Sequence, residues 1–276
     1  MKEPKRKKLL DAIDSVFKRE IKRQWKDNGY VISDISKEAQ EEMKILTKQH
    51  KRKFHPIFET IHEDGNIKED TKRLQMILKG IDDYPRVMKY LETEIKSFAS
   101  IFLEDYQPTS AVCIRSYKGG KNQQLHRDMT KQQYYLLQEE VHSCIVTTDT
   151  AFINVIHPVK NVKEKVEIPS NSLLIFHGRL VHSGSSYKKT NTRYHCYLGG
   201  QELQKILEKD ERFLDTSEAY IEGDTGLDWE FTDEELSTFI GDEQNAYENA
   251  ITKLQEFLMA EVSPKLKRTI KVLAMS

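Results

Sequence analysis

The chain of 276 residues has little of what would place it in several specialised classes of protein. It contains three cysteines, Cys113, Cys144 and Cys196, and so sparse and odd a set is typical of reduced thiols, not of a disulfide framework. No apolar run approaches the roughly 20 residues that a membrane-spanning helix needs. The basic start at Met1–Lys8 leads into an amphipathic pattern instead of the apolar core of a signal peptide. We therefore expect a cytoplasmic protein, with a nuclear location as the alternative, and no membrane partner.

The chain also lacks a net charge of one sign, since 43 Lys and Arg stand against 44 Asp and Glu. Its ends differ, because basic residues exceed acidic ones in residues 1–60 and the reverse holds in residues 201–276. The basic clusters could contact nucleic acid or an acidic partner, but such clusters are more often solvated faces. There is no zinc finger and no basic motif interleaved with aromatic residues. Nucleic acid is therefore not favoured as a partner.

The most informative motif is His126-Arg-Asp128, followed 54 positions later by His182 and a further 11 positions on by Arg193. Residues i and i+2 of a strand point to the same face, so His126 and Asp128 could bind one metal ion together. His182 would then come from a distant strand that folds alongside. Two histidines and one carboxylate are the facial triad of non-haem Fe(II), which leaves about three octahedral positions open for oxygen chemistry. Arg193 is the basic residue that an anionic cosubstrate would need.

Residues 1–105 form the first of three regions and look mainly helical. Apolar residues recur at every fourth position from Leu9 to Trp25, which predicts one apolar stripe on a helix. Ser36 is expected to cap the next helix, and Pro85 to open the last one. The segment 68–79, closed by a glycine, is interpreted as another helix.

Residues 106–200 change to short β-rich runs separated by turns, and residues 201–276 are acidic and again helical in pattern. The predicted strands cover residues 111–117, 143–156, 166–168, 172–176 and 192–198. Many short strands around a central metal fit a double-stranded β-helix, the jelly-roll class that includes the cupins. We therefore predict a mainly β core with flanking helices (α+β), and we expect the three regions to pack as one compact unit.

Two windows of the sequence resemble the Fe(II)/2-oxoglutarate-dependent dioxygenase superfamily. The window from Arg115 to Asp128 is similar to the Tyr-x-x-Gly-(five residues)-His-x-Asp stretch of prolyl-hydroxylase-like and alkylated-DNA-repair members. The window from Ser172 to Leu198 resembles phytanoyl-hydroxylase-like members, in which an arginine follows the distal histidine at this interval. The resemblance covers roughly residues 110–200.

The resemblance implies Fe(II) as cofactor, 2-oxoglutarate as cosubstrate and O2 as oxidant. Neutral His126 and His182 and anionic Asp128 would hold the iron. 2-Oxoglutarate would chelate it through its 1-carboxylate and 2-keto oxygen. Arg193 would pair with the distal carboxylate through a planar fork that stays charged.

Further cosubstrate contacts are expected from Tyr117, Ser183 and Ser185. Tyr117 matches a tyrosine that hydrogen-bonds 2-oxoglutarate in several relatives, although an ordinary core or rim tyrosine is equally consistent. The phytanoyl-hydroxylase pattern has a serine two residues after the distal histidine, where this chain has Gly184. Ser183 and Ser185 are therefore the candidate second donors to the distal carboxylate. His195 is interpreted as a core histidine, with support of the metal site as the alternative.

The residues disfavour three competing interpretations. His177 could replace His182 as the third ligand, but Arg193 would then follow 16 residues later, off the family interval. The second His-x-Asp, at residues 62–64, lies in a polar stretch that reads as a loop between helices. His-Arg-Asp also opens the catalytic loop of protein kinases, which requires an asparagine where this chain has Gln133.

The function that the resemblance implies is hydroxylation of an unactivated C–H bond, coupled to decarboxylation of 2-oxoglutarate to succinate and CO2. Asp128 favours hydroxylation, because halogenating relatives replace this carboxylate with a small residue. A small-molecule substrate is slightly preferred to a protein side chain, and nucleic acid comes third. The alternatives are a catalytically silent metal-binding β-helix module and a cupin-like metalloenzyme independent of 2-oxoglutarate, using zinc or manganese. Intact Asp128 and Arg193 disfavour the silent module, and the cupin-like enzyme would have little need for Arg193 at its position.

Overall fold

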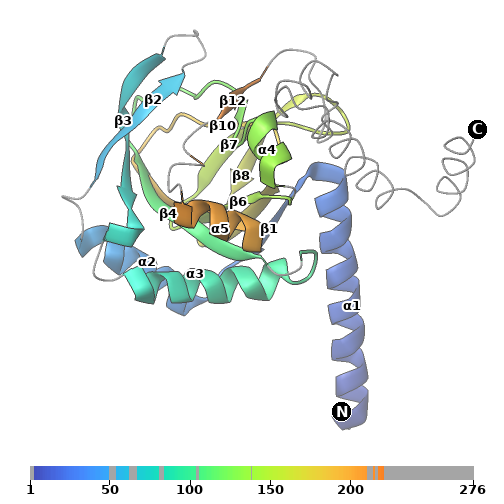
Figure 1. Ribbon diagram of the computed structural model, residues 1–276. Coiled ribbons are helices and arrows are strands. Elements are labelled where there is room, and N and C mark those ends of the chain that lie inside the picture. Colours follow the sequence, from blue (N-terminus) through green and yellow to red (C-terminus); the bar gives the residue numbers. More distant parts are fainter. Residues whose placement is uncertain are drawn as a thin grey trace, which may run out of the picture. The chain divides into compact units, whose positions relative to one another are not determined.

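The computed structural model of the protein describes residues 3–49, 54–61, 67–80, 84–103, 106–137, 139–209, 214 and 217–220. The chain divides into two compact units, residues 1–228 and residues 229–276, and every element described below belongs to the first. In this unit two antiparallel β-sheets are accompanied by a few helices (Figure 1). The predicted mainly β architecture with flanking helices is confirmed at this level. None of the described helices is both long and apolar enough to cross a membrane.

The larger sheet has its strands in the order β1-β9-β6-β11-β4-β3-β2. Their bounds are β1 (Tyr30–Asp34), β2 (His55–Ile61), β3 (Ile67–Ile77), β4 (Gln107–Ser116), β6 (His142–Thr147), β9 (Ser172–His177) and β11 (Asn191–Gly199). The smaller sheet has the order β12-β5-β10-β7-β8. Its strands are β5 (His126–Arg127), β7 (Ala151–Ile156), β8 (Lys163–Ile168), β10 (His182–Gly184) and β12 (Glu218–Ala219).

The central strands of the larger sheet are buried on both faces. Along β11, Tyr194 and Cys196 pack in a core cluster to which the helices also contribute side chains. Arg193 and His195, which alternate with them, face the smaller sheet. The cluster between the sheets joins Ile145 and Phe176 of the larger sheet to Val155 and other residues of the smaller one. Such two-sided burial explains the continuous apolar run at residues 173–176 of β9.

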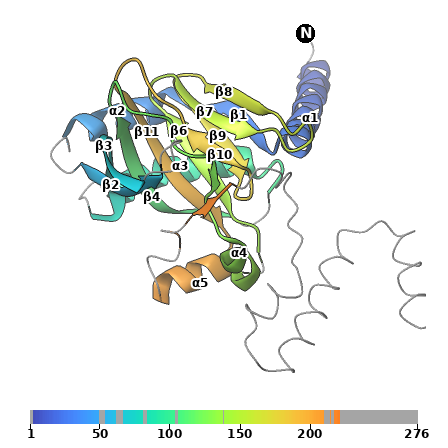
Figure 2. The ribbon, with the colours of Figure 1, turned by 90° about the horizontal axis from the view of Figure 1, so that it is seen from above.

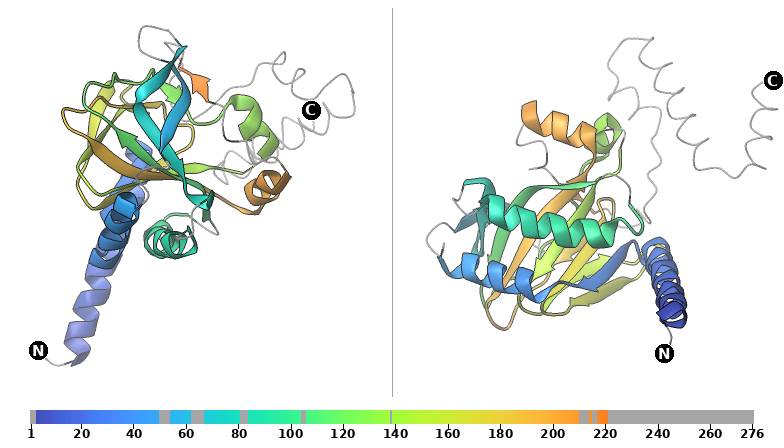
Figure 3. Two further views of the ribbon diagram at one scale, coloured as in Figure 1. Left: turned by 90° about the vertical axis from the view of Figure 1, so that its left-hand side faces the viewer. Right: turned by 90° about the horizontal axis from the view of Figure 1, so that it is seen from below.

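Helices α1 (Glu3–Asn28), α2 (Lys37–Gln49) and α3 (Tyr84–Ala99) supply side chains to the core on the outer face of the larger sheet. Figure 3 shows α2 and α3 running across this face. The Ser36 hydroxyl accepts the Ala39 N–H at 3.2 Å, which confirms the predicted cap of α2. On α1, Ile21 is buried and Trp25 packs on the core, whereas Phe17 is 47% exposed. Among the described side chains of the predicted stripe, burial thus begins at Ile21.

The prediction of a helix over residues 68–79 is wrong. Residues Ile67–Ile77 form β3, which pairs with β4 so that Arg73 lies opposite Ser116, and only Leu78–Gly80 make a 3-10 turn, η2. The composition is rich in Lys, Glu, Leu, Gln and Met, which favour helices, but pairing between strands outweighs so weak a preference. The mainly helical interpretation of residues 1–105 is corrected accordingly, since β1, β2 and β3 all come from it. Residues 62–64 lie outside the described residues.

Two short helices complete the described unit. Helix α4 (Lys131–Leu137) follows the His126–Asp128 motif, and α5 (Gln201–Lys209) follows β11. Residues from both segments share one apolar cluster with Val141, and Figure 2 shows the two helices side by side. The predicted helical pattern of the acidic region continues over residues 221–276, which lie outside the described residues.

Candidate metal centre

Strand pairing brings His126, Asp128 and His182 together. His126 opens β5, Asp128 follows its last residue, and β10 pairs with β5 so that His182 lies directly opposite His126. The candidate donor atoms of the three side chains lie within 4.8 Å of one another. The Asp128 Oδ1 atom is 3.3 Å from His182 Nε2 and 3.7 Å from His126 Nε2. Donors from residues 54 positions apart in the sequence thus surround one point.

The hydrogen bonds of both histidines prepare them to bind a metal through Nε2. His126 Nδ1 is 2.8 Å from the Gln124 carbonyl oxygen, and His182 Nδ1 is 3.0 Å from the Leu180 carbonyl oxygen. A carbonyl oxygen only accepts hydrogen bonds, so each Nδ1 carries a proton, and the neutral ring keeps a lone pair at Nε2. Two imidazoles and one carboxylate, with the other coordination positions open, fit Fe(II).

Asp128 is itself held by two strands of the larger sheet. The Ser143 hydroxyl on β6 donates a hydrogen bond to Asp128 Oδ2, and His195 Nε2 on β11 lies 3.8 Å from the same oxygen. Burial raises the pKa of Asp128, but the charges and hydrogen bonds of His182 and His195 lower it well below the ordinary value. The carboxylate is therefore anionic and fixed in orientation, as a metal ligand requires. His195 takes the supporting position that the sequence left as an alternative, and sequence reasoning missed Ser143.

The two histidines differ in their protonation. Burial, followed by the charge of His182, lowers the pKa of His126 to about 4, so that ring is neutral at physiological pH. Burial also lowers the pKa of His182, but the charge and hydrogen bond of Asp128 outweigh it and leave the pKa raised. The raised pKa means that a proton competes with a metal ion for Nε2 of His182.

Arg193 lies on the same face of β11 as His195 and about 7 Å further along the strand. Its side chain is 4% exposed, and its Nη1 donates to the Ser116 hydroxyl at 2.9 Å. The guanidinium carbon also lies 5.7 Å from the centre of the Tyr187 ring. Among the residues that the structure describes, no carboxylate forms an ion pair with Arg193. Because an uncompensated buried charge is costly, this position suits a bound anion.

Among the described residues, no hydrogen bond joins Tyr117 or Ser183 to Arg193 or Ser116. Tyr117 follows the end of β4, whose alternation directs Ser116 toward Arg193, and the Tyr117 hydroxyl bonds to none of the described residues. Ser183 lies on the opposite face of β10 from His182 and accepts a hydrogen bond from Asn154 at 3.2 Å. Neither placement favours contact with a cosubstrate.

Ser185, the other serine expected near the cosubstrate, follows the end of β10 and is 1% exposed. Its hydroxyl is buried without a hydrogen-bond partner within the described structure. Its backbone carbonyl accepts a hydrogen bond from Arg73 at 3.4 Å. Ser185 therefore contacts Arg73 through its main chain.

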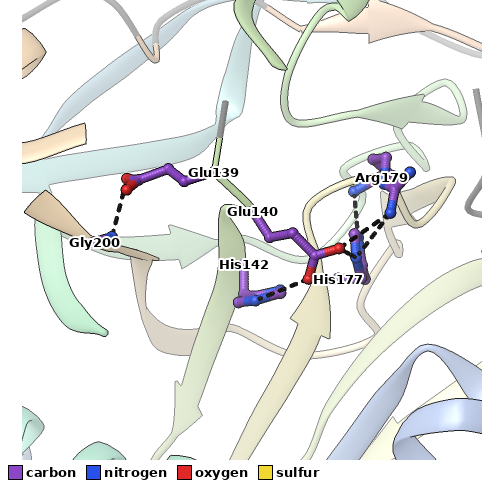
Figure 4. Close-up of polar contacts among 6 residues, drawn as sticks. All are labelled: Glu139, Glu140, His142, His177, Arg179 and Gly200. Carbon is purple, nitrogen blue, oxygen red and sulfur yellow. Dashed lines mark hydrogen bonds and ion pairs between the residues drawn. The ribbon is translucent and has the colours of Figure 1, made fainter. Parts of the chain in front are cut away.

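His177, the competing ligand in the sequence, belongs to a second polar cluster with Glu140, His142 and Arg179 (Figure 4). Glu140 Oε1 lies 3.2 Å from both His177 Nε2 and Arg179 Nη2. His177 Nδ1 accepts the Arg179 backbone N–H at 3.2 Å, so the ring proton is on Nε2, where a metal would bind. This tautomer and the adjacent guanidinium favour an ion-paired hydrogen-bond cluster over a metal site. The buried His142 ring has no hydrogen-bond partner there.

Figure 4 also shows that Glu139 and Glu140 point in opposite directions. Glu139 accepts the backbone N–H groups of Gly200, Glu202 and Leu203, at 3.0, 3.3 and 2.8 Å, and thereby caps the start of α5. Adjacent carboxylates thus serve two different elements, and neither contacts the candidate metal centre.

Comparison with known proteins identifies the fold. No known family profile matches the sequence, and no curated protein matches it either. Among solved structures, a prolyl hydroxylase of Trichoplax adhaerens in complex with a hypoxia-inducible-factor peptide is 13% identical with a TM-score of 0.53. The match covers 72% of this chain and 96% of that one.

Two α-ketoglutarate-dependent enzymes of nogalamycin biosynthesis are similar to the same extent. The epimerase SnoN is 8% identical with a TM-score of 0.52, covering 67% of this chain and 84% of its own. The carbocyclase SnoK is 11% identical with a TM-score of 0.51, covering 66% and 83%. The chain therefore has the fold of the non-haem 2-oxoglutarate-dependent enzymes, and the resemblance drawn from its sequence motifs is confirmed at the level of fold.

Proposed function

We propose that this protein is an Fe(II)/2-oxoglutarate-dependent oxygenase on a double-stranded β-helix core. The observation that carries the proposal is that the ligand atoms of His126 and His182 and the carboxylate of Asp128 lie within 4.8 Å of one another, with both Nδ1 atoms hydrogen-bonded to main-chain carbonyls. His126, Asp128 and His182 would hold Fe(II), and Arg193 would bind the distal carboxylate of 2-oxoglutarate. When bound, the iron and cosubstrate supply oxidising power from O2, with release of succinate and CO2.

The proposed reaction is hydroxylation of an unactivated C–H bond in a small molecule or a protein side chain. Asp128 occupies the carboxylate position, as hydroxylation requires. The structural neighbours include one enzyme solved with a peptide and two from nogalamycin biosynthesis, which supports keeping both substrate classes open. We prefer a small molecule, because the interval from His182 to Arg193 is phytanoyl-hydroxylase-like. Substrate choice resides in rim residues that differ between proteins of one fold.

The proposal is tested by anaerobic absorption titration with Fe(II) and then 2-oxoglutarate. A weak visible charge-transfer band that needs both ligands is expected. His182→Ala should abolish it, and Arg193→Gln should shift its midpoint to far higher 2-oxoglutarate concentration. His177→Ala is the matched control, since it removes a buried histidine of the second cluster and should leave the band intact.

Two rivals predict other outcomes. A silent metal-binding module would bind Fe(II) but release no succinate with any substrate. A cupin-like metalloenzyme would bind its metal with no response to 2-oxoglutarate, although the buried Arg193 then lacks an anion to bind. A folded, iron-loaded protein without the band would contradict the assignment of the cosubstrate.

A further inference from the structure

A short strand near the end of the described chain lies against the strand that carries His126. Strand β12 stands at one end of the smaller sheet and pairs with β5. In this register Ala219 lies directly opposite His126, so the two side chains share a face, with their Cβ atoms about 5 Å apart. The segment 217–220, here called the brace, therefore adjoins the candidate metal centre.

The brace is hydrogen-bonded on both sides of the His126–Asp128 pair. On one side, the Tyr220 N–H donates to the Leu125 carbonyl at 2.9 Å. On the other side, the Glu218 carboxylate accepts the Lys131 N–H at 2.7 Å. Leu125 directly precedes the first candidate ligand, and Lys131 opens α4 shortly after the second. The contacts of the brace thus span the whole stretch that carries both ligands.

Glu218 completes the hydrogen bonding at the start of α4. The Thr130 hydroxyl accepts the Gln133 N–H at 3.2 Å, and the Gln133 side chain accepts the Thr130 N–H at 2.8 Å, which is a capping box. This box does not serve the Lys131 N–H, and Glu218 supplies its acceptor from 87 positions away in the sequence. A local box and one long-range carboxylate together fix the backbone that leaves Asp128.

Strand β5 and the brace are both short elements with few anchors. β5 has two residues, and its pairing with β10 is confined to His126 opposite His182. Within the described structure, no residue of the brace belongs to an apolar core cluster, and Ser217 and Ala219 are exposed. Elements held in this way open at a low cost in free energy. The position of the ligand pair therefore depends on whether the brace is docked.

We propose that Glu218 is a positioning residue of the metal centre, and that docking of the brace and binding of the metal stabilise each other. The inference rests on the proposed function. A metal ion held by His126, Asp128 and His182 would fix β5 against β10, and the docked brace fixes the same strand from its other edge. Each constraint lowers the entropic cost of the other. By linkage, the brace favours the metal by the same factor by which the metal favours the docked brace.

A purely structural role for Glu218 makes a different prediction. Loss of a helix cap alone would lower the Tm, but it would leave the metal affinity of the folded protein unchanged. Glu139 provides the matched comparison, because its carboxylate caps α5 by accepting three backbone N–H groups and does not contact the candidate metal centre. The two carboxylates therefore separate a general capping effect from an effect on the ligands.

The first measurement is the Kd of Mn(II) for the full-length protein, determined by calorimetry without 2-oxoglutarate. Glu218→Ala should raise this Kd about tenfold, within the range typical of coupling between two sites. Glu218→Gln keeps an acceptor oxygen and should recover part of the affinity. Glu139→Ala should lower the Tm and leave the Kd unchanged. An unaltered Kd in Glu218→Ala, or equal losses in Glu218→Ala and Glu139→Ala, would overturn the role of Glu218.

Hydrogen exchange followed by mass spectrometry measures the reciprocal effect in the wild-type protein. Mn(II) should slow exchange in a peptide that covers residues 217–220, and Glu218→Ala should lose this slowing. Strand β8, at the opposite end of the smaller sheet, is the internal control and should not respond. Exchange in the brace that is indifferent to Mn(II) would overturn the coupling, even if Glu218→Ala does not fold. If the wild-type protein binds neither Mn(II) nor Fe(II), the proposed function itself fails.

Discussion

His126 and His182 face each other across the strand pair β5–β10, with 4.7 Å between their ring centres, and each anchors its Nδ1 on a main-chain carbonyl. The backbone therefore sets the tautomer of both rings before any metal binds. In the second cluster the backbone N–H of Arg179 imposes the opposite tautomer on His177. Main-chain hydrogen bonds thus distinguish two histidine clusters of similar composition.

Metal binding should release a proton and weaken in acid. The pKa of His182 is raised by Asp128, so this ring holds a proton over a wider pH range than a free histidine. A metal ion competes with that proton, and its affinity should fall as the pH falls through this pKa. Calorimetry of Mn(II) binding in two buffers with different ionisation enthalpies measures the proton directly. An identical enthalpy in both buffers at neutral pH would contradict this account.

Ser143→Ala should weaken the metal centre without touching a ligand. The Ser143 hydroxyl donates to Asp128 Oδ2 and orients the carboxylate, and loss of such a contact typically costs about 10- to 100-fold in metal affinity. Ser183→Ala is the control, since this serine is equally buried but faces away from His182. Equal losses of Mn(II) affinity in both variants would show a general packing effect instead.

Glu140 should stabilise the fold in a way that depends on pH. Burial raises its pKa, but the hydrogen bond from His177 and the nearby positive charges lower it from 4.5 to about 2. A lowered pKa in the folded state means that the stabilisation is complete above about pH 4.5 and is lost as the pH falls toward 2. The difference in Tm between wild type and Glu140→Gln should therefore shrink over this window. A difference that stays constant from pH 7 to pH 2 would refute the ion pair.

Gly184→Ala should be destabilising, by about 1–3 kcal/mol. The new Cβ would lie 2.3 Å from Gln123 Oε1, which accepts the Gly184 N–H at 3.0 Å. Gln123→Ala removes the obstacle, so the double variant should lose less stability than the sum of the two single variants. Chemical denaturation of the three variants and the wild type measures this coupling, and strict additivity would mean that the side chain moves aside without cost.

The sequence motifs located the candidate ligands and the β-rich region, because both depend on local patterns. Alternation within strands placed His126 and Asp128 together. The short β-rich runs between turns marked β4, β8, β9 and β11, and one run over residues 143–156 covered both β6 and β7 without separating them. Segment 68–79 misled this reasoning, because its residues favour helices and its strand form depends on pairing with β4. The pairing of Arg73 with Ser116 was missed for the same reason, since a residue assigned to a helix far from the motif gave no signal of proximity.

The sequence alone determines which residues are the candidate ligands and in what order they occur. It also places Gly184 where the resemblance led us to expect a serine. Which hydroxyl accompanies Arg193 and which histidine supports Asp128 depend on strand register. A shift of one residue between neighbouring strands turns each of these side chains to the opposite face. Long-range pairing of β4 with β11 therefore assembled the anion position beside Ser116 from segments whose separate sequences contain no sign of one another.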